Sequence, residues 1–246
     1  MAEAVAAQRT PRTGIRPSFH LWMVLVMCVF IFGGFGMTYL GPLATGTFPP
    51  APPVVHLHGA VFFGWMLLLV AQSLLVNVRN VRLHRSLGTF GIAYAGAIVL
   101  LGVLITIISS ATTQWTADSY GLFYLSFVAP VSFAAIFSLA IRSLKTPAVH
   151  RNLILLATLS ILMPGINRLY MMSLGLQHVP FYGTYATMDV ILAAILLHER
   201  RSGAISRATW IGAAIIVVPQ LLMPVVAPSE AFHQFCHFMG SLAYYR

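Results

Sequence analysis

Charged residues are scarce in this sequence, and their scarcity excludes an ordinary soluble fold. Only 8% of the 246 residues are Asp, Glu, Lys or Arg, whereas 59% are hydrophobic. A soluble domain carries about 25% charged residues. A chain with so little polar surface cannot face water on all sides, so lipid must surround most of it. We therefore expect an all-α integral membrane protein.

Several chemical signatures are also missing. Two cysteines cannot form a disulfide framework, and no P-loop, dinucleotide fingerprint, nucleophile elbow or Cys-x-x-Cys motif is present. The sole lysine, Lys145, lies between two apolar runs, so no final-span lysine exists for a Schiff base to retinal. The net charge of +9 is not arranged in a basic helix or an aromatic-basic strand, which excludes nucleic acid as a partner.

What the sequence does contain is a series of apolar runs about as long as a bilayer requires. Roughly 20 apolar residues cross about 30 Å of hydrocarbon as a helix. We expect a bundle of seven transmembrane helices, at 20–41, 53–77, 87–110, 121–142, 152–174, 182–198 and 208–227. Residues 1–19 then form a basic cytoplasmic tail, and the membrane domain covers 20–227 with its core at 53–174.

The basic residues lie on one side of this layout. Twelve of the 14 Lys and Arg fall in the first tail or in alternate connections: Arg9, Arg12, Arg16, Arg79, Arg82, Arg85, Arg142, Lys145, Arg151, Arg200, Arg201 and Arg207. The opposite connections contain one basic residue, Arg246, together with Asp118 and Glu230. This bias predicts a multi-pass membrane protein with its N-terminus inside and its C-terminus outside.

Helix breakers and small residues add detail to the spans. Pro130, Pro164 beside Gly165, and Pro219 each predict a kink, because proline removes a backbone donor. Gly33, Gly34 and Gly36 in the first span predict close helix packing.

The last segment, 228–246, is typical of an amphipathic helix. Ser229 is a good N-cap and Glu230 follows in the first turn. One face is apolar and consists of Phe232, Phe235, Cys236, Met239 and Leu242. We expect this helix to lie in the outer interface of the membrane.

Two charges stand inside the expected hydrocarbon. Arg168 is near the outer end of the fifth span, and Asp189 is about two turns into the sixth. An unpaired charge there is costly, so we expect Arg168 and Asp189 to form a buried ion pair. The pair would serve either as a structural link between helices or as part of a proton or quinone site.

Two His-Arg pairs, His84-Arg85 and His150-Arg151, open the third and fifth spans on the inner side. One haem b iron accepts two imidazoles from facing helices, and the two arginines would meet the haem propionates. His58 is a further candidate ligand. The alternative is that His-Arg pairs at the interface bind lipid phosphates.

The outer side offers a second set of histidines. His56 and His58 point about 200° apart on a helix, so the two cannot chelate one metal there. His233 and His237 are spaced i, i+4, which suits a transition metal but also the wet face of an amphipathic helix. A composite outer metal site would draw on His56, His58, His178, His233 and His237, with Glu230.

Four short motifs together resemble a known family: His-x-His-Gly before Trp65 and Gln72, Arg-Leu-His-Arg-Ser-Leu-Gly, Val-His-Arg-Asn-Leu, and Asn167-Arg168-Leu169. They resemble a bacterial family of uncharacterised predicted membrane proteins, domain of unknown function 2306, over roughly residues 54–170. The resemblance implies a helical, multi-pass protein of the bacterial inner (plasma) membrane and supplies no activity.

A more distant likeness is to the ascorbate-reducible transmembrane b-type cytochromes. Those proteins bind two haems through histidines on spans two to five. His58, His84 and His150 match such places, but the expected fourth span, 121–142, contains no histidine. The likeness therefore implies one bis-histidine haem more readily than two.

Three functions remain open from the sequence. The leading hypothesis is a membrane redox protein with haem b or another metal, working with a quinone or a membrane redox complex. The alternative is a non-catalytic membrane subunit or small-molecule permease whose His-Arg pairs bind membrane lipid. The third is a metal-dependent membrane hydrolase or hydroxylase at the outer side.

Overall fold

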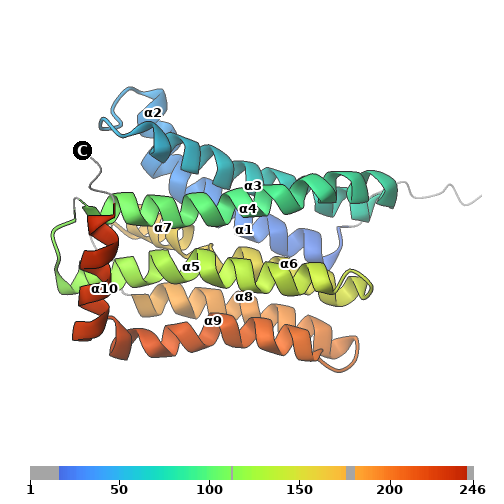
Figure 1. Ribbon diagram of the computed structural model, residues 1–246. Coiled ribbons are helices and arrows are strands. Elements are labelled where there is room, and N and C mark those ends of the chain that lie inside the picture. The colour runs from blue at the N-terminus through green and yellow to red at the C-terminus, as the bar shows by residue number, and fades with distance from the viewer. Residues whose placement is uncertain (1–16, 112, 176–180, 243–246) are drawn as a thin grey trace, which may run out of the picture.

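The fold is known from a computed structural model, which describes residues 17–111, 113–175 and 181–242 (Figure 1). The described residues form helices without any strand, which confirms the all-α prediction. The elements are α1 (Phe19–Phe35), a π-helix η1 (Gly36–Leu40), α2 (Gly41–Ala44), α3 (Pro53–Asn77), α4 (Val81–Ala111), α5 (Ala117–Arg142), α6 (Pro147–Ser160), α7 (Met163–Leu174), α8 (Phe181–Arg201), α9 (Arg207–Val226) and α10 (Glu230–Ser241). Among the described residues, six helices are long and apolar enough to cross a membrane, and the number is seven if the bent pair α6 and α7 is counted as one span. The protein is a multi-pass membrane protein.

The bundle has a basic end and an opposite end. The turns between α3 and α4, α5 and α6, and α8 and α9 lie together and carry the basic residues; we call this the basic end. Neighbours along the chain pack antiparallel, α3 on α4, α4 on α5 and α5 on α6, while α1 packs on α7 and α3. Helix α6 lies at the centre, where Leu153, Leu156 and Leu159 are fully buried. Helices α8 and α9 cover it on one side.

The fifth span is broken, as the prediction of a kink near Pro164 required. Helices α6 and α7 meet at an angle of 53°. Pro164 has no N–H to donate to the carbonyl of Ser160, so the helical ladder stops there. The N–H of Gly165 instead bonds to the carbonyl of Leu162 at 3.0 Å. The other two prolines, Pro130 and Pro219, lie inside helices that continue past them.

The break brings α7 into very close contact with α1. A Cβ on Gly165 would lie 2.8 Å from Cδ1 of Ile31 and 2.9 Å from the carbonyl oxygen of Phe30. A Cβ on Gly34 would collide with the carbonyl oxygen of Gly165. The backbones cross where only glycine fits, which confirms for Gly34 the close packing expected of the first-span glycines. Gly36, by contrast, has nothing within 4 Å of such a Cβ.

Helix α10 is amphipathic as expected, but its apolar face packs against protein. In Figure 1 it crosses the ends of α4 and α5. Its buried residues Cys236 and Met239 form a small core with Phe123 of α5. Gly240 approaches the backbone of Ser110 in α4, where a Cβ would lie 3.3 Å from the carbonyl oxygen. The helix therefore caps the bundle at the end opposite the basic one.

Candidate functional site

The two His-Arg pairs occupy equivalent places at the basic end. His84 is the fourth residue of α4 and His150 the fourth of α6, and both helices run in the same direction. Local features stabilise the start of each helix. The Asn80 side chain accepts a hydrogen bond from the Leu83 N–H at 3.2 Å at the start of α4, and Pro147 occupies the first turn of α6. The two histidines therefore lie at the same end of the bundle and at the same position in their helices.

The hydrogen bonds of this pair leave polar atoms free. Nδ1 of His150 lies 2.9 Å from the carbonyl oxygen of Ala140, so a proton there leaves Nε2 as an electron-pair donor. Nδ1 of His84 is buried and makes no hydrogen bond. Beside it, Oε1 of Gln72 on α3 is also buried and unpartnered. Buried polar atoms without hydrogen-bond partners are rare, and a bound group would supply the missing partners.

The neighbouring arginines remain near water. Arg85 is exposed, and Arg151 donates from Nε to the carbonyl oxygen of Pro147 at 3.2 Å. Neither is held by a carboxylate in the described part of the chain, so both guanidinium groups are available to an anionic group at this rim. Lipid phosphate and a carboxylate of a bound cofactor would satisfy them equally well.

A second histidine cluster at the basic end escaped the sequence analysis. Nε2 of His20 lies 2.9 Å from Oδ1 of Asn152. The His198 ring stacks on Phe19 at 3.9 Å between centroids and meets the edge of His20 at 5.4 Å. These side chains come from α1, α6 and α8. No spacing in the sequence links them, because helix packing alone makes the cluster.

The expected ion pair between Arg168 and Asp189 is not formed, and this corrects the sequence-based prediction. The Arg168 guanidinium lies over the Phe35 ring of α1, 4.4 Å from its centroid, and donates to the carbonyl oxygen of Pro164 at 3.3 Å. It also interacts electrostatically with His58. Asp189 instead lies beside Gln220 of α9. The bend before α7 turns Arg168 toward α1 and α3, away from α8.

His56 and His58 diverge as expected from their spacing. Nδ1 of His56 lies 2.8 Å from the Tyr39 hydroxyl, whereas the His58 ring packs on Phe62 at 4.1 Å between centroids. Nδ1 of His58 is buried without a hydrogen bond. The two rings therefore contact different residues, and they do not bind one metal ion together.

The composite outer metal site is also not formed by the described residues. His233 stacks on Tyr120 at 3.6 Å between centroids, and Nε2 of His237 lies 3.0 Å from the Tyr120 hydroxyl. Within residues 17–111, 113–175 and 181–242, no three His, Cys, Asp or Glu side chains converge as a metal site would require. His178 lies outside the described residues. The i, i+4 pair faces an aromatic ring because α10 packs on α5.

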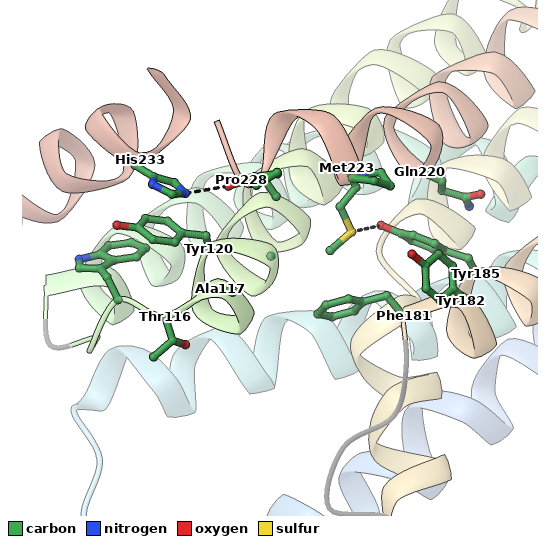
Figure 2. Close-up of a pocket in the computed structure, with 14 residues that line it drawn as sticks. Thr116, Ala117, Tyr120, Phe181, Tyr182, Tyr185, Gln220, Met223, Pro228 and His233 are labelled. Carbon is green, nitrogen blue, oxygen red and sulfur yellow. Dashed lines mark hydrogen bonds between the residues drawn. The ribbon is translucent and has the colours of Figure 1, made fainter. Parts of the chain in front are cut away.

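The same end also contains a cavity that the sequence did not reveal. It has a volume of about 350 Å³ and lies among α5, α8, α9 and the start of α10 (Figure 2). Its wall includes Trp115, Tyr120, Phe181, Tyr182 and Tyr185, with the Tyr185 hydroxyl bonded to Sδ of Met223 at 3.0 Å. No Lys, Arg, Asp or Glu is among the lining residues. Such size and lining are typical of small-molecule sites.

Comparison with protein-family models, with curated proteins and with solved structures gave no match for this chain. Function must therefore be argued from the sites themselves.

Proposed function

We propose that the protein is a membrane redox protein that holds one b-type haem between His84 and His150. One observation supports the proposal: His84 and His150 are each the fourth residue of parallel helices that begin at the same end, beside buried polar atoms of His84 and Gln72 that have no hydrogen-bond partner. Two imidazoles from facing helices are a standard axial pair for haem iron. The bound group would supply one-electron chemistry.

The residues present suit such a group. The bond of His150 Nδ1 to the Ala140 carbonyl fixes the ring and leaves Nε2 as the ligand atom, which is the usual support for a metal-bound histidine. Arg85 and Arg151, next in sequence to the two ligands, would bind propionates at the water boundary. Helix α5 contains no histidine, which favours a single haem.

Absorbance spectra of the purified protein test this proposal. Reduced-minus-oxidised spectra should show Soret and α bands, and His84→Ala or His150→Ala should abolish both. His198→Ala is the matched control, because that histidine lies at the same end but stacks on Phe19. The control variant should keep the wild-type bands. A wild type without these bands and without bound iron, copper or zinc by elemental analysis would refute the proposal.

A quinone partner would find its site at Arg168. This guanidinium lies on an aromatic face near His58 and has no carboxylate partner in the described residues, so it can donate to a carbonyl oxygen. Arg168→Gln should then slow reoxidation of the haem by a soluble quinone analogue while leaving its spectrum unchanged. Equal reoxidation rates would remove the quinone from the proposal.

A second candidate function is small-molecule permeation. The broken α6–α7 span favours it, because transporters place interrupted helices at their substrate sites. The nearby 350 Å³ cavity would supply such a site. A protein that lacks haem but moves a cavity ligand into proteoliposomes would decide for this function and against the redox proposal.

A further inference from the structure

Part of the cavity at the end opposite the basic one is left open by a glycine. Gly121 is buried on α5, and a Cβ there would lie 3.0 Å from Cε of Met223 and 3.2 Å from Cε2 of Phe181. All three residues line the cavity, whose volume is about 350 Å³ (Figure 2). A larger side chain at position 121 would therefore fill the space that a small ligand needs.

The wall of this cavity favours an uncharged ligand. The 14 described residues that line it include no Lys, Arg, Asp or Glu. Tyr120 closes one end in a stack with Trp115 and His233, at 4.9 Å and 3.6 Å between centroids, and the rings of Phe181 and Tyr185 line the other end. An ion that moved from water to this wall would lose its hydration without gaining a counter-charge. An apolar, aromatic molecule would lose little.

Two hydrogen-bond donors at the inner end of the cavity lack a good acceptor. The Tyr185 hydroxyl donates to Sδ of Met223 at 3.0 Å, and a thioether is a weak acceptor. Nε2 of Gln220 is buried and has no hydrogen-bond partner, and its neighbour Asp189 is not a lining residue. Tyr185 and Gln220 also line a smaller cavity of about 40 Å³, which reaches Met163 at the break between α6 and α7. An oxygen atom of a ligand would satisfy both donors.

We propose that this cavity binds an uncharged aromatic ketone. The aromatic body lies against Phe181 and over Gly121, and the carbonyl oxygen accepts hydrogen bonds from Tyr185 and Gln220. A carbonyl matches this pair because it has two lone pairs and no hydrogen to donate. The site lies at the other end of the bundle from the proposed haem, so this inference goes beyond the haem function and does not depend on it.

Photolabelling with benzophenone tests where such a molecule binds, because its excited carbonyl forms a covalent bond with C–H groups in contact with it. The full chain in phosphatidylcholine nanodiscs is irradiated with benzophenone, and the labelled peptides are identified by mass spectrometry. The main label should fall on the peptide that contains Met223, and Gly121→Leu should abolish it. Gly96→Leu is the matched control and should keep the label, because the space around Gly96 is open. Labelling spread over the lipid-facing helices and unchanged by Gly121→Leu would overturn the proposal.

Competition against this label tests the charge and the carbonyl group of the ligand. Fluorenone is an uncharged ketone, fluorene is the same ring system without the oxygen, and diphenylacetate and benzhydrylammonium are ions of similar size. Fluorenone should halve the labelling at a concentration about tenfold below that of fluorene or of either ion, as expected for two hydrogen bonds in an uncharged wall. Equal or stronger competition by fluorene or by an ion would refute the proposed ligand class.

A conservative variant tests the hydrogen bond without changing the shape of the cavity. Tyr185→Phe keeps the ring and removes the hydroxyl, so it should weaken competition by fluorenone about threefold and leave competition by fluorene unchanged. The same loss for both competitors, or no loss for fluorenone, would show that Tyr185 does not bind a ketone oxygen and would contradict the proposal.

Discussion

The separation of Arg168 from Asp189 can be tested by a double-mutant cycle. The variants are Arg168→Met, Asp189→Asn and the two combined, and the quantity measured is the free energy of unfolding in mixed micelles. If the two charges were paired, removing one would strand the other and cost about 3–5 kcal/mol. The structure gives each charge different neighbours, so neither single change strands its counterpart.

The expected magnitudes follow from the contacts of each side chain. Arg168→Met loses one hydrogen bond at 3.3 Å and the contact with the Phe35 ring, but it also removes a buried charge. Because these effects oppose one another, the net change should stay within about 1 kcal/mol. Asp189→Asn removes a charge that has no cationic partner among the described residues and keeps a side chain that can still contact Gln220, so it should be neutral or stabilising.

The coupling energy between the two substitutions shows whether Arg168 and Asp189 interact. Residues without shared contacts usually give additive effects within about 0.5 kcal/mol, and we expect this result. A coupling energy above about 1 kcal/mol would show that the two side chains interact after all. The placement of Asp189 beside Gln220 and away from Arg168 would then be wrong.

Three further predictions concern the packing of the bundle. Gly165→Ala should lower the free energy of unfolding by about 1–3 kcal/mol, because the added methyl would lie 2.9 Å from a carbonyl oxygen of α1. Gly96→Ala is the control and should not destabilise α4, because the space around Gly96 is open. Burial raises the pKa of the Cys236 thiol to about 11, so the thiol should resist maleimide at pH 8. Since the folded state holds this proton more tightly than the unfolded chain, that contribution to stability should fall as the pH rises from about 9 to about 11, which chemical denaturation at several pH values would detect. Glu199→Ala should cost about 1–3 kcal/mol in the same assay, because Oε1 of this buried residue accepts the Ser206 N–H at 3.1 Å and holds the turn between α8 and α9.

Hydropathy and charge bias were enough to predict the spans, because each depends on a continuous stretch of chain. Helix α3 has the expected bounds, and the kink before Pro164 follows from the missing N–H alone. The placement of His84 and His150 at the same end was also foreseeable. Each opens a helix at the same end, so their depths agree without knowledge of how the helices rotate.

The ion pair could not be predicted, because it depends on more than the depth of each residue. Sequence position gives the depth of Arg168 and Asp189, but it does not give the direction in which each side chain points. Helix α7 leaves α6 at an angle of 53°. A small error in the expected direction of this bend therefore places the Arg168 side chain at α8 when it actually lies at α1. The aromatic cavity could not be predicted from the sequence for a related reason. Its wall combines residues of α5, α8, α9 and α10, and no pattern within one segment reports their meeting.

The length of α4 has a consequence for how electrons would enter. Its 31 residues extend about 46 Å, against roughly 30 Å for the acyl-chain layer. Arg82 and Arg85 make the first turns of α4 its charged end, so we expect the surplus length at the level of the lipid headgroups there. A water-soluble donor arriving from that side would therefore meet the level of His84 before any acyl chain, and the surrounding arginines would draw in a carrier with an acidic face.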